Sequence, residues 1–103
     1  MEGTISVGEL KAKKSLHIID VREPDEYEHD HIEGAVNIPL GELIRDERLG
    51  IVPRDREVVV HCRSGVRGEI ALQFLKSRGY ADVKNLEGGF VAWKQAQCSK
   101  RKK

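Results

Sequence analysis

Cysteine is scarce in this chain, which has two among its 103 residues. Cys98 lies in a polar stretch just before a basic end, where nothing in the pattern would hold it against Cys62, so we expect no structural disulfide. No apolar run approaches the roughly 18 residues of a membrane span, and the first residues lack the basic and apolar segments of a secretory leader. These absences favour a protein of the reducing cytoplasm with no membrane partner.

Excess charge is also missing from the body of the chain. The formal net charge is +1, of which residues 100–103 contribute +4, so residues 1–99 sum to −3. A basic end of this kind can bind nucleic acid or anionic lipid, but it has no aromatic residue among its charges and no basic face behind it. We therefore expect no nucleic-acid partner. We interpret residues 1–97 as one domain, followed by a solvated basic tail over residues 98–103.

Short apolar runs alternate with segments of helical spacing along the domain. β-branched or small residues predict strands at residues 4–5, 16–21, 34–39, 58–62 and 83–86. Helices are predicted between them, including one after the capping box of Ser6 and Glu9 and one between the Ser64-Gly65 turn and Gly79. Strands separated in this way pair in parallel through right-handed crossovers. The predicted fold class is α/β: a three-layer single domain with a central, mostly parallel sheet of about five strands and helices on both faces.

The stretch after the clearest strand combines the elements that thiolate chemistry needs. Cys62 ends the strand, Gly65 can take a positive φ, and a helix follows, so successive backbone N–H groups can turn inward around an anion. Arg63 and Arg67 add positive charge, which favours the nucleophilic thiolate. We predict that Cys62 is the catalytic nucleophile and covalent carrier. The alternative is that Cys62 is a small apolar residue that closes a buried strand.

Four stretches together resemble the single-domain rhodanese (thiosulfate sulfurtransferase) family. They are the Cys62 loop, Asp-Val-Arg-Glu at residues 20–23, His-Ile-Glu-Gly-Ala-Val-Asn-Ile-Pro at 31–39 and Gly-Gly-Phe-Val-Ala-Trp at 88–93. The resemblance implies a rhodanese-like fold and a sulfurtransferase that moves a sulfane sulfur from thiosulfate or a persulfide donor to cyanide or a thiol acceptor through a Cys62 persulfide. Such thiol acceptors include thioredoxin-like proteins and glutathione. No cofactor is expected, and the histidines show no spacing typical of a metal site.

For this reaction, the loop would bind the donor and the transferred sulfur. We predict that its backbone N–H groups surround the outer persulfide sulfur and that its arginine side chains attract an anionic donor. The predicted substrate-binding residues are Arg63, Ser64, Gly65, Val66 and Arg67. The alternative for Arg67 is an ordinary position on the helix surface.

Residues outside the loop are expected to act indirectly. The resemblance implies that Asp20 and Arg22 form a polar network that shapes the floor of the site without taking part in the chemistry. His61 alternates with Cys62 along the strand, so we expect it to face the opposite side of the sheet as a packed or hydrogen-bonded residue. Gly68 departs from the family pattern, because many relatives have a small hydroxyl residue there, and we expect little effect on the chemistry.

The sequence leaves two alternative functions to be considered. The first is a cysteine phosphatase of the rhodanese fold. Those enzymes have five residues between cysteine and arginine, whereas four separate Cys62 from Arg67, which gives a narrower loop that suits one sulfur atom better than a phosphoryl group. The second is a non-catalytic interaction module or sulfur-relay component. The intact cysteine and loop argue against a module that only binds, but they do not separate a free enzyme from a relay component.

Overall fold

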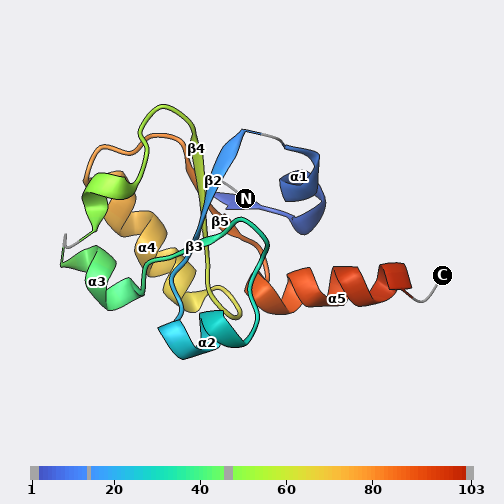
Figure 1. Ribbon diagram of the computed structural model, residues 1–103. Coiled ribbons are helices and arrows are strands. Elements are labelled where there is room, and N and C mark those ends of the chain that lie inside the picture. Colours follow the sequence, from blue (N-terminus) through green and yellow to red (C-terminus); the bar gives the residue numbers. More distant parts are fainter. Residues whose placement is uncertain (1–2, 14, 46–47, 102–103) are drawn as a thin grey trace.

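One parallel sheet forms the centre of the molecule (Figure 1). The computed structural model describes residues 3–13, 15–45 and 48–101, with the backbone alone for residues 98–101. The strands are β1 (Thr4–Ile5), β2 (Leu16–Asp20), β3 (Val36–Asn37), β4 (Glu57–His61) and β5 (Val83–Leu86). Their order in the sheet is β1-β5-β4-β2-β3, and every pairing is parallel. The prediction of an α/β domain with a largely parallel sheet of about five strands is confirmed.

β4 is the central strand and pairs with β2 on one side and β5 on the other. Asp20 of β2 is in register with His61, and Asn85 of β5 is in register with Val60. Because the strands are parallel, their carboxyl ends lie along one edge of the sheet, where α/β proteins form their ligand sites. Cys62 follows β4 directly and therefore leaves the sheet between the ends of β2 and β5.

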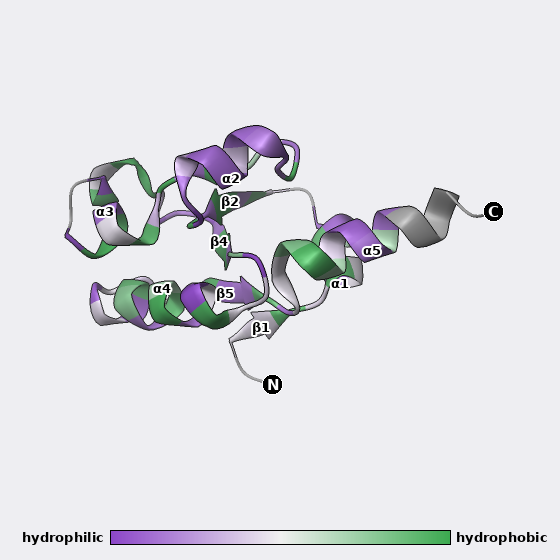
Figure 2. Cartoon of the chain, turned by 90° about the horizontal axis from the view of Figure 1, so that it is seen from below, coloured by the Kyte–Doolittle hydropathy of each residue, from purple (hydrophilic) through white to green (hydrophobic). Residues whose placement is uncertain are grey.

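Helices cover both faces of the sheet (Figure 1). They are α1 (Val7–Ala12), α2 (Pro24–His29), α3 (Leu40–Ile44), the short 3-10 helix η1 (Leu49–Ile51), α4 (Val66–Ser77) and α5 (Gly89–Arg101). The side chains of β4 alternate between two cores. Val58, Val60 and Cys62 pack with residues of α3 and α4, whereas Val59 packs with residues of α1 and α5. α2 is hydrophilic along its length and buries none of its residues (Figure 2).

Local signals in the sequence account for most of the element boundaries. The Ser6 hydroxyl accepts a hydrogen bond from the Glu9 backbone, and the Glu9 carboxylate accepts one from the Ser6 backbone, so the predicted capping box begins α1. The predicted strand at 34–39 is shorter in the structure and pairs only at Val36–Asn37. Gly34 with its positive φ of 88° and Pro39 frame that short pairing.

α5 continues to Arg101, so its last residues lie in the segment 98–103 that we interpreted as a basic tail. Residues 90–101 contain neither glycine nor proline, and their lysine, glutamine and alanine residues favour a helix, which explains the extension. Residues 102–103 of the predicted tail and the side chain of Cys98 lie outside the described part of the chain. None of the helices described is long and apolar enough to cross a membrane.

Candidate active site

The sulfur of Cys62 lies inside the loop that joins β4 to α4. The residue is 1% exposed, and its Sγ accepts hydrogen bonds from the backbone N–H groups of Gly65, at 3.0 Å, and Gly68, at 3.3 Å. Backbone N–H groups that converge on one atom in this way are the arrangement that proteins use to bind anions. The first donor belongs to the predicted segment 63–67, and the second lies just beyond it.

Gly65 makes the turn that brings these donors to the sulfur. Its φ of 129° falls in the region that favours glycine, and its carbonyl oxygen accepts the first hydrogen bond of α4, from Glu69 at 2.9 Å. The next two amides, of Val66 and Arg67, stand at the helix N-terminus and have no acceptor within the helix. No other acceptor for them is found among the described residues. The loop therefore offers further N–H donors beside those already on Cys62.

The start of α5 holds the same loop from the other side. The Phe90 N–H donates to the Cys62 carbonyl oxygen at 2.8 Å, and the Val91 N–H donates to the Arg63 carbonyl oxygen at 3.0 Å. A Cβ atom at Gly89 would lie 2.6 Å from each of these two oxygens. Gly89 is thus needed for a close backbone approach, a role that the sequence did not reveal because the approached residues are distant in the chain.

The two arginines of the loop have different surroundings. Arg63 is exposed, whereas the guanidinium of Arg67 donates to both carboxylate oxygens of Glu26 on α2, at 2.9 and 3.3 Å. The hydrogen bonds from Arg67 lower the pKa of Glu26 to about 2, and those same bonds raise the pKa of Arg67. Glu26 is therefore ionised at neutral pH and offsets the charge of Arg67. No sequence signal pointed to Glu26, which is 41 residues away.

Asp20 and Arg22 form a compact buried ion pair at the end of β2. They are 0% and 5% exposed, and the Arg22 Nε and Nη2 atoms donate to Asp20 Oδ1 and Oδ2 at 2.9 and 2.7 Å. Arg22 also donates to the carbonyl oxygen of Asp30 at 2.7 Å and lies over the ring of Phe90. The pair thus links β2, the end of α2 and the start of α5. Within the described residues, neither side chain is hydrogen-bonded to the Cys62 sulfur.

His61 is packed on the opposite face of the sheet from the Cys62 side chain. It is fully buried, its ring stacks with that of Phe90 at a centroid distance of 6.3 Å, and its Nδ1 lies 3.3 Å from the Cys62 carbonyl oxygen. Burial lowers the pKa of His61, which favours the neutral imidazole. The alternation along β4 correctly predicted this placement, and among the described residues no hydrogen bond joins His61 to the Cys62 sulfur.

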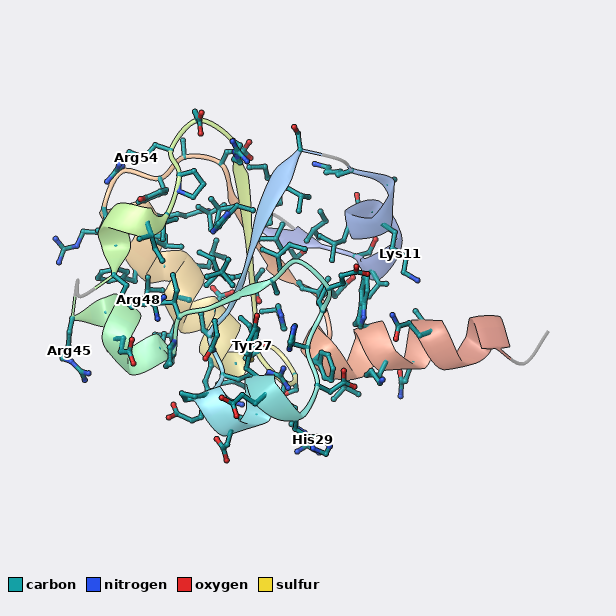
Figure 3. All side chains as sticks on the ribbon, viewed as in Figure 1. Lys11, Tyr27, His29, Arg45, Arg48 and Arg54 are labelled. Carbon is teal, nitrogen blue, oxygen red and sulfur yellow. The ribbon has the colours of Figure 1, made fainter. Side chains whose placement is uncertain are left out.

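A cavity of about 420 Å³ lies away from this loop. Its lining includes Val52, Arg54 and Tyr80, which precede β4 and β5 and so mark the amino ends of the strands. Figure 3 shows Arg54 at the edge of the molecule opposite to Tyr27 and His29 of α2. Since Cys62 lies at the carboxyl end of β4, this cavity is separate from the sulfur site.

Comparison with known proteins agrees with this geometry. A family model described as the Rhodanese-like domain matches residues 6–96, which include the Cys62 loop, α2 and the start of α5. The chain belongs to the rhodanese-like domain family. This rhodanese-like domain resembles a solved rhodanese-related protein from Thermoplasma volcanium with a TM-score of 0.82 and 33% identity, over 90% of this chain and 91% of the other.

Curated relatives of this rhodanese-like domain include sulfurtransferases. The thiosulfate sulfurtransferase GlpE of Shewanella oneidensis is 35% identical over 90 residues, which cover 87% of each protein. The probable adenylyltransferase/sulfurtransferase MoeZ of Mycobacterium tuberculosis is 43% identical over 89 residues, which cover 85% of this chain but 23% of MoeZ. The chain therefore spans less than a quarter of that larger relative. These relatives support sulfur transfer in general.

Proposed function

We propose that this rhodanese-like domain is a sulfurtransferase in which Cys62 carries a sulfane sulfur as a persulfide. The observation that carries the proposal is the pair of N–H groups, from Gly65 and Gly68, that donate to the Cys62 sulfur at the end of β4. A cysteine that only filled the core would gain nothing from two amide donors, whereas a thiolate or persulfide is stabilised by them. The sulfurtransferase relatives support the same conclusion.

The proposed reaction has two steps at one sulfur. The Cys62 thiolate attacks the outer sulfur of thiosulfate, a new S–S bond forms, and the S–S bond of thiosulfate breaks with its electron pair leaving on sulfite. Cyanide or an acceptor thiolate then attacks the outer sulfur of the persulfide. Thiocyanate or a new persulfide forms, and the Cys62 thiolate is restored. Each step conserves electrons and charge, so the proposed cycle uses no oxidant, reductant or cofactor.

The loop residues 63–67 receive the donor in this proposal. The amides of Val66 and Arg67, which lack acceptors among the described residues, would hold the outer sulfur after transfer. Arg63, exposed at the mouth, would attract an anionic donor. Asp20 and Arg22 would support the loop only indirectly, since they tie the neighbouring elements together.

The acceptor class follows from the chemistry rather than from a visible partner site. A persulfide passes its outer sulfur readily to a thiolate, so we propose small thiols such as glutathione, or a cysteine of a thioredoxin-like protein, as acceptors. Reduced thiols of this kind are abundant in the cytoplasm, which we propose as the compartment. A free enzyme and a component of a sulfur relay would use the same steps.

Phosphatase activity is the weaker alternative. The loop places four residues between Cys62 and Arg67, and the Arg67 guanidinium is already bound through both sides to Glu26. A phosphoryl group needs several donors around three oxygens, and an arginine paired with a carboxylate is not free to supply two of them. This contact therefore favours sulfur transfer over phosphate hydrolysis.

A paired assay tests the proposal. The wild-type protein, supplied with thiosulfate and cyanide, should produce thiocyanate with ping-pong kinetics. It should not hydrolyse p-nitrophenyl phosphate. Cys62→Ser should abolish thiocyanate production, while Cys98→Ser should leave it unchanged. An active Cys62→Ser protein, or phosphatase activity without thiocyanate formation, would show that the proposal is wrong.

A further inference from the structure

Asn85 is a buried polar residue next to the sulfur site. It lies on β5 in register with Val60 and is 6% exposed. Val83, two residues earlier on the same strand, belongs to the core formed with α4. Because side chains two residues apart in a strand share a face, Asn85 also points toward α4. It meets the first turn of that helix, directly after the Cys62 loop.

The Asn85 amide contacts both residues whose N–H groups hold the sulfur. Its Nδ2 donates to the carbonyl oxygen of Gly65 at 3.1 Å. At Gly68, a Cβ atom would overlap Asn85 Oδ1, and the three atoms nearest to it would all belong to Asn85. The Asn85 amide thus occupies the space that any side chain at position 68 would need, and a glycine at this position admits it.

This amide is only half satisfied by hydrogen bonds. Asn85 Oδ1 is buried and has no hydrogen-bond partner among the residues that the structure describes. A buried acceptor without a partner lowers stability, so packing alone would favour an apolar residue here. What the polar side chain provides is the hydrogen bond from Nδ2 to the loop.

We propose that Asn85 is a positioning residue of the sulfur site and that Gly68 is a glycine in order to admit it. By holding the Gly65 carbonyl, Asn85 fixes the turn that aims the Gly65 N–H at Cys62 Sγ. By packing against the backbone of Gly68, it fixes the second N–H donor. The consequence for turnover rests on the proposed function, but the effect on the reactivity of the Cys62 sulfur toward an alkylating agent does not.

The pH profile of Cys62 alkylation tests this inference directly. We would measure the rate constant for iodoacetamide in a Cys98→Ser background, so that one thiol reacts, together with kcat and KM for thiosulfate. Asn85→Ala and Asn85→Asp both remove the donor to Gly65. They should move the alkylation profile to higher pH and lower kcat about fivefold to tenfold. KM for thiosulfate should change little, because Asn85 is not among the residues proposed to bind thiosulfate.

Val83→Ala is the matched control. It removes core packing from the same strand and face and should lower stability. Its apolar side chain makes no hydrogen bond to the loop, so its alkylation profile should match that of the parent protein. Asn85 variants with the same profile and kcat as Val83→Ala would overturn the inference, because Asn85 would then contribute to packing alone.

Gly68→Ala provides a second test that keeps Asn85 in place. Its methyl group must displace the Asn85 amide, so it should move the alkylation profile in the same direction as Asn85→Ala. In an Asn85→Ala background that space is empty, and Gly68→Ala should then have little further effect. An equal effect in both backgrounds, or an unchanged profile for Gly68→Ala alone, would contradict the proposal.

The design also separates this inference from the proposed function. If the wild-type protein forms no persulfide from thiosulfate while the alkylation profile still responds to Asn85, then the positioning role stands and sulfur transfer fails. If persulfide forms normally and the profile is insensitive to both Asn85 and Gly68, then sulfur transfer stands and the positioning role fails.

Discussion

Glu26 and Arg67 form a two-point ion pair, with nitrogen–oxygen distances of 2.9 and 3.3 Å, that joins α2 to the first turn of α4. Arg67 is thereby held next to the Cys62 loop with its charge already compensated. The surface around the Cys62 loop consequently carries less positive charge than the two arginines of the loop suggest. Glu26 should therefore influence how well a doubly charged sulfur donor such as thiosulfate binds.

Removing the Glu26 charge should improve the use of thiosulfate. In Glu26→Gln the net field of Arg67 at the loop increases, so we expect KM for thiosulfate to fall about threefold to tenfold at low ionic strength, with the gain reduced by added salt. Asp25→Asn is the matched control, because Asp25 is an exposed acid on the same helix and carries the same charge. Steady-state kinetics of both variants would contradict the account if the control gained as much as Glu26→Gln.

The same ion pair should contribute to stability in a pH-dependent way. Arg67 holds the pKa of Glu26 at about 2, below its ordinary value, so the contribution is present above about pH 4.5 and is lost as the pH falls toward 2. Because both side chains are about one-third exposed, we expect about 1 kcal/mol. Urea unfolding of the wild type and Glu26→Gln between pH 2 and 7 measures it. A stability difference that stayed constant over this range would rule out the ion pair as its source.

Breaking the buried ion pair should cost much more. Asp20→Asn leaves the guanidinium of Arg22 buried without a carboxylate, so we expect a loss of about 3–5 kcal/mol in the free energy of unfolding. Lys13→Ala is the comparison, since Lys13 is exposed in its pair with Glu57 and should contribute less than about 1 kcal/mol. Chemical denaturation of the two variants at pH 7 gives both values, and similar losses would contradict the assignment of Asp20 and Arg22 to the buried framework of the site.

The sequence was most informative where a signal is local. The capping box of Ser6 and Glu9 and the positive φ of Gly65 are each determined by a few neighbouring residues, and each was predicted. The strand predicted at 58–62 is observed at Glu57–His61, one residue earlier at each end. The parallel sheet followed from the alternation of strands and helices. No end was predicted for the last helix, and α5 runs to Arg101 because residues 90–101 contain neither glycine nor proline.

Contacts between distant segments were not predictable from the sequence. Glu26 is an ordinary acid in the first turn of α2 until the fold places it against Arg67. Asn85 likewise looks like a strand residue, and only the packing of β5 against α4 brings it to Gly68. A single sequence contains no signal for such pairs, because they depend on how the layers are stacked.

A side chain at Gly89 should disturb the site from the α5 side. In Gly89→Ala the methyl group would lie 2.6 Å from the carbonyl oxygens of Cys62 and Arg63, and the φ of 61° is itself unfavourable for alanine. We expect a loss of about 2–4 kcal/mol in stability and lower sulfur transfer at a temperature where the protein is still folded. Gly50→Ala, where a Cβ would have no neighbour within 4 Å, should change stability by less than about 0.5 kcal/mol. Equal stability of the two variants would mean that the close approach of α5 to the loop is not required.

The most direct test of the account is the mass of Cys62 after reaction with thiosulfate alone. The wild-type protein should gain about 32 Da, located by peptide mapping on the peptide that contains Cys62, and cyanide should remove this mass as thiocyanate. The Cys98 peptide should remain unmodified. A wild-type protein that gains no mass at Cys62, or that gains it at Cys98 instead, would contradict the claim that the sulfur held by the Gly65 and Gly68 amides is the carrier.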